Sequence, residues 1–242
     1  MEFKEFEALF IQSMQQNGLD APAPQTTEAF YRFDQHLHTV NSHTNLTAIR
    51  SSEEAISKHY VDSLLISQMI PPGSRVLDLG CGPGFPSTPL AIYRPDLEII
   101  ALDSTAKKIA FVQSTKELLA LSNLTPISGR AEDQALAKSL GQFDVVVSRA
   151  VARMNILCEL CLPYLKIGGV LLAMKGAKGE EELVEAEHCI KTLGGLPGIL
   201  FDGVLVIPNG STEVRTLIKV QKEKKTPSGY PRNFSQIQKK PL

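Results

Sequence analysis

Apolar residues in the first 70 positions recur at a spacing of three or four, which is typical of amphipathic helices. Phe3–Met14 predicts a first helix, and Gly18 follows its end. Thr26–Val40 predicts a second helix and Ser52–Leu64 a third, with a break in the pattern at 45–48. We expect the aromatic side chains of this region to be core residues rather than a platform for a ligand.

From residue 75 onward, short apolar runs alternate with helical segments. Two late runs, 198–207 and 214–220, are joined by Pro208-Asn209-Gly210-Ser211, which is a hairpin signal. The pattern predicts an α/β fold: a doubly wound, Rossmann-like sheet, mostly parallel, with a C-terminal antiparallel hairpin and an N-terminal helical extension. The five runs expected to form the parallel strands are 76–79, 98–103, 125–128, 143–147 and 170–174.

Helical spacing marks several segments between these strands. The periodic stretches are Lys107–Leu121, Met154–Leu165 and Glu180–Leu193. Lys166–Gly169 ends in two glycines, so we expect it to stop the second of these helices and to form a turn.

The stretch Arg75–Pro89 carries the first candidate chemistry. A strand runs into Gly80-Cys81-Gly82-Pro83-Gly84, and Pro86 suits the first turn of a helix. This order of strand, glycine turn and helix holds nucleoside-bearing cofactors. The spacing is G-x-G-x-G rather than the G-x-G-x-x-G of dinucleotide sites, and Pro83 removes one amide donor. We therefore expect Gly80, Gly82 and Gly84 to allow close approach of a bulky ligand without phosphates; the alternative is a tight loop only.

Asp103 ends the second strand. It lies roughly 20 residues past the glycines, where an acidic side chain meets the ribose hydroxyls in βαβ nucleotide sites. A carboxylate can accept hydrogen bonds from both hydroxyls of a ribose. The alternative is that Asp103 caps the helix that follows.

Composition limits the function classes. With 242 residues, of which 43% are hydrophobic and 21% charged, the chain suits one globular domain with an extension. No apolar run reaches the length of a membrane span, and the N-terminus lacks the apolar core of a secretory signal. The four cysteines are scattered, so we expect a cytoplasmic protein without disulfides, and the histidines show no metal-ligand pattern.

Bulk charge gives no support for nucleic-acid binding, because the net charge is −1 and the pI is about 6.5. The C-terminal end is nevertheless basic, and Tyr230 and Phe234 lie within it. That combination suits phosphate contacts with base stacking, although a solvated tail is the alternative. The basic residues are Lys219, Lys222, Lys224, Lys225, Arg232, Lys239 and Lys240.

Several short motifs together carry a family resemblance. They are Asn45-Leu46-Thr47, His59-Tyr60-Val61-Asp62-Ser63, the glycine loop with Pro89-Leu90-Ala91-Ile92, Asp103-Ser104, Ser148-Arg149-Ala150-Val151-Ala152, Lys175-Gly176 and Tyr230-Pro231-Arg232. With these motifs the chain resembles the bacterial small-subunit ribosomal RNA methyltransferase G family, also called glucose-inhibited division protein B. It departs from the family at Ser87-Thr88-Pro89, where Gly-Ile-Pro is usual, and after Arg232, where a further glycine is usual.

The resemblance implies an enzyme that uses S-adenosyl-L-methionine to methylate N7 of a guanine in 16S ribosomal RNA, either as free RNA or in the small ribosomal subunit. It implies that Gly80 and Phe85 line the cofactor site and that Ala131 and Glu132 lie at its adenine end. Arg149 would lie near the methionine end or the target base.

We expect the chain to consist of three parts. These are the helical extension (1–70), an S-adenosylmethionine-dependent methyltransferase domain (71–221) and a basic tail (222–242). We expect a monomer that contacts no membrane.

Such a reaction needs little acid–base chemistry, because guanine N7 carries a lone pair and no proton. Arg149 and Lys175 each follow a strand and are the candidate catalytic residues, expected to hold RNA phosphates or base acceptors. The alternative for both is ion pairing at the surface. His59 and Asp62 are three residues apart on one helix and can touch. They either face the target base or form a buried pair that braces the extension.

Two other functions stay open on the residues alone. One is an NAD-dependent oxidoreductase on the same sheet, which the glycine spacing and the closing hairpin oppose. The other is a non-catalytic ribosome-binding module, which the intact glycine loop and Asp103 oppose. Cys158 and Cys161 form a lone C-x-x-C without a second pair, so we expect structural thiols rather than a zinc site.

Overall fold

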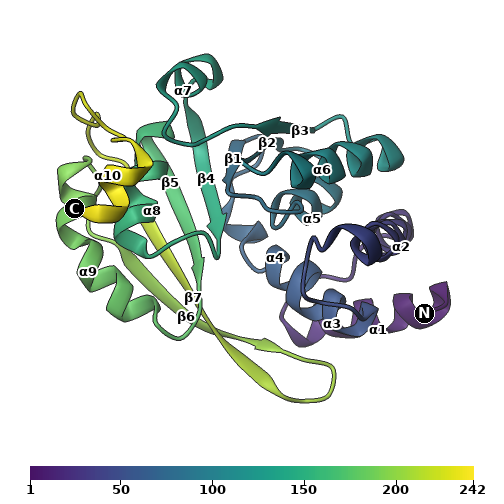
Figure 1. Cartoon of the computed structure of the whole chain (residues 1–242). Coiled ribbons are helices and arrows are strands. Elements are labelled where there is room, and N and C mark those ends of the chain that lie inside the picture. The colour runs from purple at the N-terminus through teal and green to yellow at the C-terminus, as the bar shows by residue number, and fades with distance from the viewer.

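The computed structural model describes residues 1–242 and contains one seven-stranded sheet with helices on both faces (Figure 1). The strand order is β3-β2-β1-β4-β5-β7-β6. β1 to β5 pair in parallel, whereas β7 is antiparallel to both β5 and β6. This confirms the doubly wound sheet with its closing hairpin. The strands are β1 (Arg75–Leu79), β2 (Glu98–Asp103), β3 (Leu124–Ser128), β4 (Phe143–Arg149), β5 (Leu165–Lys175), β6 (Ile199–Val206) and β7 (Thr212–Gln221).

Two groups of helices cover the two faces of the sheet, and each group forms its own hydrophobic core. The first face is covered by α1 (Phe3–Gln16), α2 (Pro24–Thr44), α3 (Ser52–Ala55), α4 (Asp62–Leu64), α5 (Ser87–Tyr93) and α6 (Ala106–Leu119). The second is covered by α7 (Gln134–Leu140), α8 (Met154–Cys161), α9 (Gly179–Thr192) and α10 (Phe234–Lys239).

Strand side chains alternate between these two cores. Val145 and Val147 of β4 pack in the first core, and Val146 between them packs in the second. Because both faces are covered, the parallel strands are apolar at successive positions rather than at every second one. None of the helices is both long and apolar enough to cross a membrane.

The aromatic core predicted for the N-terminal extension is confirmed. Phe10 and Phe30 of α1 and α2 are fully buried, with ring centroids 4.7 Å apart. α2 ends at Thr44 because Asn45 adopts a left-handed conformation, with φ of 51°. The Asn41 side chain stabilises this end by accepting hydrogen bonds from the two amides that follow Asn45.

The third helix of the extension contains a π-helical turn, η1 (Ile56–Val61), between α3 and α4. Turns of this kind are rare in proteins, and those that occur are often found at functional sites. This one carries His59 and runs directly into Asp62, so both side chains are presented toward the edge of the sheet where β4 ends.

The helix expected over Met154–Leu165 is shorter in the structure. α8 ends at Cys161 and a 3₁₀ turn, η3 (Leu162–Tyr164), follows it. Pro163 explains the difference, because it lacks an amide hydrogen and its ring clashes with the carbonyl four residues earlier in an α-helix. β5 then begins at Leu165, so Lys166–Gly169 lies within a strand and not in the expected turn.

The C-terminal segment is packed against the second core. Ile237 of α10 is fully buried, and Lys222 is 2% exposed, with its ammonium donating to the carbonyl oxygen of Leu193. Arg232 pairs with the buried Glu159 of α8, with 2.6 Å between Nη2 and Oε2. RNA contacts by the remaining basic side chains stay a prediction; those that are exposed are Lys224, Lys225, Lys239 and Lys240.

The four cysteine thiols are buried and form no disulfide. Burial raises the pKa of Cys158 and of Cys161, which keeps both thiols neutral. Cys158, Cys161 and Cys189 all lie in the second core, as expected for structural thiols. No group of three or more His, Cys, Asp or Glu side chains is placed to hold a metal ion.

Candidate functional site

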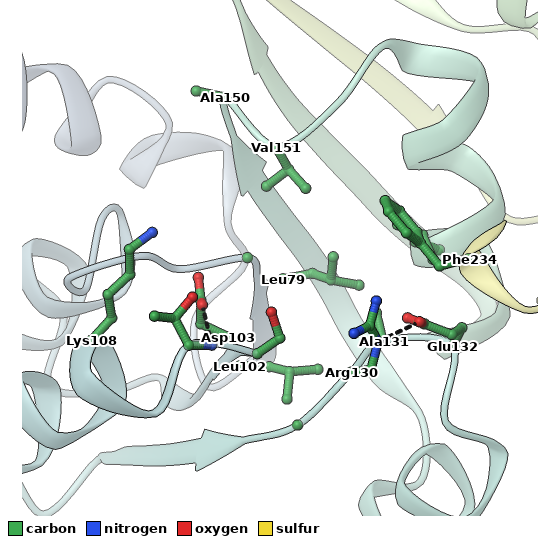
Figure 2. Close-up of a pocket in the computed structure, with 15 residues that line it drawn as sticks. Leu79, Leu102, Asp103, Lys108, Arg130, Ala131, Glu132, Ala150, Val151 and Phe234 are labelled. Carbon is green, nitrogen blue, oxygen red and sulfur yellow. Dashed lines mark hydrogen bonds and ion pairs between the residues drawn. The ribbon is translucent and has the colours of Figure 1, made fainter. Parts of the chain in front are cut away.

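A cavity of about 340 Å³ opens where β1, β2 and β4 end at their carboxyl edge (Figure 2). Ligands bind at this edge in doubly wound sheets. Asp103 lies on one side of the cavity, and the opposite side carries Ala131 and Phe234 next to the Arg130–Glu132 ion pair. Its lining includes Leu79, Gly80, Leu102, Asp103, Lys108, Arg130, Ala131, Glu132, Val151, Leu160 and Phe234.

The glycine loop after β1 leaves no amide free for a phosphate. The amides of Gly80 and Cys81 both donate to the carbonyl oxygen of Leu102, at 2.8 and 3.1 Å. The amides of Gly84 and Phe85 donate to the carbonyl oxygen of Cys81. The Gly82 amide donates to the Asp103 carboxylate, and Pro83 has no amide hydrogen. A pyrophosphate would therefore find no donors in this loop, which contrasts with dinucleotide-binding loops.

Two glycines of the loop are required by their surroundings. Gly80 has φ of +76°, and a Cβ there would lie 2.3 Å from a Val151 methyl group. Gly84 has φ of +94°, and a Cβ there would lie 2.3 Å from the Thr88 hydroxyl. Gly80 thus lets the β4–α8 loop approach the glycine loop and close one side of the cavity.

Asp103, at the end of β2, is held by two backbone amides. Its Oδ2 accepts from the Gly82 amide at 2.9 Å, and its Oδ1 accepts from the Thr105 amide at 2.7 Å. Each carboxylate oxygen keeps a further lone pair, so the group can still accept from a ligand. The carboxylate lines the cavity and is oriented in advance, which reduces the cost of ordering it on binding.

The far side of the cavity from Asp103 combines apolar groups with one ion pair. Ala131 and Glu132 follow β3, and the hydroxyl of Tyr164 donates to the Ala131 carbonyl oxygen at 2.9 Å. Glu132 pairs with Arg130 at 2.7 Å. Phe234 of the C-terminal helix faces this side (Figure 2). An aromatic, uncharged group fits here better than a charged one.

A second cavity, of about 600 Å³, adjoins the first and shares Ala150 and Val151 with it. Four basic side chains and two carboxylates line it, and Lys58 and Arg215 also pair with Glu213 at 2.9 and 3.0 Å. The charges are thus nearly balanced, and it is the N–H donors of the basic side chains that suit the cavity to an anionic ligand. The charged residues are Lys58, Asp62, Arg149, Lys175, Glu182 and Arg215.

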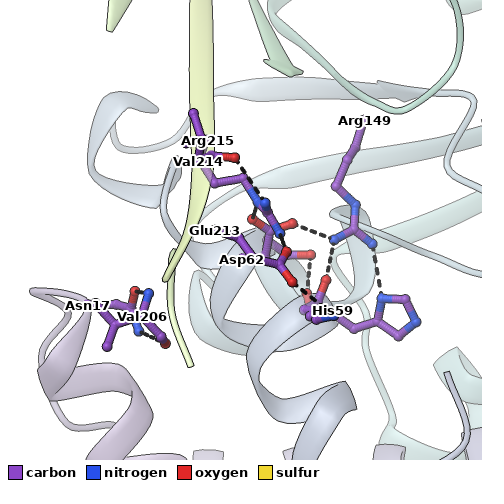
Figure 3. Close-up of polar contacts among 10 residues, drawn as sticks. Asn17, His59, Asp62, Arg149, Val206, Glu213, Val214 and Arg215 are labelled. Carbon is purple, nitrogen blue, oxygen red and sulfur yellow. Dashed lines mark hydrogen bonds and ion pairs between the residues drawn. The ribbon is translucent and has the colours of Figure 1, made fainter. Parts of the chain in front are cut away.

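Asp62 connects three elements at this second cavity (Figure 3). From α4, its Oδ2 accepts from Arg149 of β4 at 2.9 Å, and its Oδ1 accepts from Arg215 of β7 at 2.6 Å. The extension also meets the hairpin through Asn17, which exchanges two hydrogen bonds with the backbone of Val206. Ion pairs therefore join the extension to the sheet at the cavity rim.

Arg149 keeps part of its donor capacity. Its Nη1 donates to the Lys58 carbonyl oxygen at 2.8 Å and to Asp62, and its Nη2 lies 3.4 Å from His59 Nδ1. A guanidinium has five N–H donors, so hydrogens on Nε and Nη2 remain for a ligand. The ion pairing expected as the alternative is present, and the side chain nevertheless lines the cavity.

His59 is a neutral hydrogen-bonding group in this arrangement. Arg149 can only donate, so the neighbouring Nδ1 accepts, and Nε2 donates to the Thr47 hydroxyl at 2.8 Å. Burial first, and then the Arg149 charge, lower the pKa of His59 to about 3. Its ring packs on Phe85, with centroids 4.2 Å apart. His59 and Asp62 thus meet through Arg149 rather than directly, and both line the cavity.

This low pKa predicts an acid-dependent loss of stability. Unfolded His59 binds a proton below about pH 6.5 while the folded residue does not, so stability is present above that pH and is lost as the pH falls toward about 3. We expect the unfolding free energy, measured by urea titration at several pH values, to fall between about pH 6 and 4. In the unsubstituted protein it should fall by about 1.4 kcal/mol per pH unit more than in His59→Gln. Parallel pH profiles of the two proteins would contradict a depressed pKa.

Lys175 is bound by groups of the protein itself, which the sequence did not indicate. Its ammonium pairs with Glu182 of α9 at 2.8 Å and donates to the Ala152 carbonyl oxygen. Its side chain is 7% exposed. The charge is thus largely balanced within the protein, so its contact with RNA stays a prediction.

The predicted cofactor residues fall in different places. Gly80, Asp103, Ala131 and Glu132 line the first cavity, and Arg149 lines the second. Gly82, Gly84 and Phe85 line neither. Phe85 is 3% exposed because its large apolar ring packs among the aromatic side chains of the extension, so it supports His59 instead of facing the cavity expected for it.

Sequence reasoning missed several residues that line the two cavities. Arg215 is separated from Asp62 by 153 residues, and no sequence signal connects them. Nothing in the sequence marks Val151 as a cavity residue, and Leu160 lies on an apolar helix that resembles any core helix. Phe234 was noticed as an aromatic residue in a basic segment, but its place beside Ala131 depends on the docking of α10.

The comparisons with known proteins agree on one family. Residues 26–200 match the family model described as rRNA small subunit methyltransferase G. A protein named Ribosomal RNA small subunit methyltransferase G from Lachnoclostridium phytofermentans is 43% identical over 238 residues, which is 96% of each chain. One of the same name from Lactobacillus delbrueckii subsp. bulgaricus is 41% identical over 225 residues, which is 91% of this chain and 93% of that protein.

Solved structures resemble this fold at low sequence identity. A precorrin-6y C5,15-methyltransferase from Geobacter metallireducens superposes with a TM-score of 0.51 at 15% identity, over 74% of this chain and 92% of that one. A SAM-dependent O-methyltransferase from Thermotoga maritima gives 0.51 at 16% identity, over 69% and 66%. At such identities the likeness concerns the fold alone.

Proposed function

The chain belongs to the rRNA small subunit methyltransferase G family, and we propose that it transfers a methyl group from S-adenosyl-L-methionine to N7 of a guanine in 16S ribosomal RNA. The observation that carries the proposal is the junction of the two cavities at Ala150 and Val151. One cavity suits a nucleoside without phosphates and the other suits an anionic partner. A methyl donor in the first and a base in the second would meet at this junction.

The residues of the first cavity fit S-adenosylmethionine. Asp103 has free lone pairs to accept from the ribose hydroxyls, and the side near Ala131 suits adenine. The glycine loop has no free amides, which fits a cofactor without a pyrophosphate. When bound, the cofactor supplies an electrophilic methyl group on a sulfonium.

The residues of the second cavity fit RNA. Lys58 and Arg215, which both pair with Glu213, place N–H donors at its rim, and Arg149 retains N–H groups on one side of its guanidinium. A planar guanidinium can contact a phosphate or the acceptor edge of guanine in a two-pronged way. His59 stays neutral, so it adds no positive charge beside a base that becomes cationic on N7 methylation.

No side chain has to remove a proton, since guanine N7 has none. The contribution of this protein is to hold the base and the methyl donor in line, and such proximity is worth up to roughly 7–11 kcal/mol of the barrier. Arg149 and the backbone at Ala150 and Val151 are the groups at the junction that can fix this alignment.

We expect S-adenosylmethionine to bind in calorimetry and NAD not to bind, because the loop offers no donors to a pyrophosphate. Incubation with methyl-labelled cofactor should label 16S RNA or small subunits that lack the modification. Cleavage of the labelled RNA after borohydride and aniline treatment would place the methyl on N7. Tight NAD binding without S-adenosylmethionine binding, or label on another atom, would overturn the proposal.

A further inference from the structure

The C-terminal helix is fixed to the protein by a buried ion pair. Glu159, in the middle of α8, is fully buried, and its carboxylate accepts from the backbone amide, Nε and Nη2 of Arg232, at 2.9, 2.8 and 2.6 Å. Asn233 caps α10 by accepting from the Gln236 amide at 3.0 Å. Ile237 then inserts into the second core. Three independent contacts thus determine where α10 starts.

Phe234 is the first residue of α10, directly after this anchor. Its half-buried ring lines the first cavity beside Ala131 and Glu132 (Figure 2). The Arg130 guanidinium lies 5.8 Å from the ring centroid. The ring therefore stands on the side of the cavity away from the carboxylate of Asp103, beside the Arg130–Glu132 ion pair.

We infer that Phe234 contacts the adenine of the bound cofactor, and that Arg232 positions it through Glu159. The inference rests on the proposed function, since it takes the ligand of the first cavity to be an adenine nucleoside. Two aromatic ring systems in contact gain from burial and from offset or edge-to-face geometry. The C-terminal segment is then a wall of the cofactor site, even though its composition resembles an RNA-binding arm.

Phe234→Ala should raise the dissociation constant of S-adenosylmethionine by about 10-fold and Phe234→Tyr by much less, since tyrosine keeps the ring. At saturating cofactor, the affinity for 16S RNA should be unchanged in both variants. Gln236→Ala, an exposed change on the same helix, serves as the matched control. Weaker RNA binding with unchanged cofactor affinity in Phe234→Ala would overturn the inference and assign the ring to the RNA surface.

The absence of tryptophan from the chain allows a direct optical test. In Phe234→Trp the single indole should change its emission when S-adenosylmethionine or S-adenosylhomocysteine is added. Ile167→Trp, at an exposed site on β5, should show no change. Adding Arg232→Lys to Phe234→Trp should shift the emission toward that of a solvated indole while the far-ultraviolet dichroism is retained. Emission unaffected by cofactor in Phe234→Trp would contradict the contact.

The failure of this inference is separable from the failure of the proposed function. If the unsubstituted protein binds no S-adenosylmethionine, the proposed function fails. If it binds the cofactor, transfers methyl groups and shows the same affinity after Phe234→Ala, only the assignment of Phe234 fails.

Discussion

Replacement of Asp103 by alanine is expected to weaken S-adenosylmethionine binding by about 10- to 150-fold. The carboxylate is oriented by the amides of Gly82 and Thr105 and has lone pairs left for the ribose hydroxyls. Hydrogen bonds to a charged group contribute about 1.5–3 kcal/mol, which corresponds to this range of dissociation constants. Calorimetry with purified protein measures the change directly.

Asp103→Ala also leaves the Gly82 and Thr105 amides without their acceptor, so a loosened loop has to be separated from a lost ligand contact. S-adenosylhomocysteine analogues without the ribose hydroxyls provide this separation, because the substitution should weaken their binding far less. Asp20→Ala, an exposed carboxylate change away from the cavity, is the control. An equal loss for hydroxylated and deoxygenated ligands would restrict Asp103 to holding the loop.

Asp62→Ala is expected to give the largest loss of stability, about 3 kcal/mol of unfolding free energy. One nearly buried carboxylate, 6% exposed, pairs with both Arg149 and Arg215. Its removal leaves the Arg149 guanidinium, which is only 15% exposed, without a counter-charge, whereas Arg215, 24% exposed, keeps its pair with Glu213 at 3.0 Å. Because these cations still reach the open second cavity, we place the loss at the lower end of values for a broken buried pair. Urea unfolding at neutral pH measures it.

Glu98→Ala is the matched control for Asp62→Ala. Glu98 accepts from Arg75 Nε at 2.9 Å, but it is 60% exposed. An exposed pair of this kind contributes less than about 1 kcal/mol. If the two alanine variants lose equal stability, the pairs of Asp62 behave as surface pairs and do not hold the extension on the sheet. A double substitution of Asp62→Ala with Arg149→Met should recover part of the loss, since it removes the guanidinium that Asp62→Ala leaves unpaired.

Local sequence signals were sufficient to predict the sheet and the side of the first cavity formed by the glycine loop and Asp103. Apolar runs and the period of the intervening helices predicted the strands, and the glycine loop with Asp103 predicted which strand ends would meet. These inferences succeed because a parallel sheet brings all its carboxyl ends to one edge, whatever the loops do. The end of α8 was missed because the apolar period continues past Pro163, where the missing amide stops the helix.

The second cavity and the side of the first cavity near Phe234 depend on contacts between residues far apart in the chain. Asp62, Arg149 and Arg215 come from an N-terminal helix and two separate strands, and each alone reads as a surface charge. Phe85 matched a family motif, yet burial of its ring among other aromatic residues takes it away from the cavity.

The sequence by itself determined the fold, the class of cofactor loop and the carboxylate at the end of β2, because each depends on backbone conformation and on residues close together in the chain. Only the tertiary structure decided which charges pair, that Lys175 is balanced by Glu182, and that Phe234 of the basic C-terminal segment lines the first cavity. The physical reason is that desolvation and pairing depend on which surfaces meet. Glu159 and Arg232, 73 residues apart, make the tail a fixed element once α8 is buried.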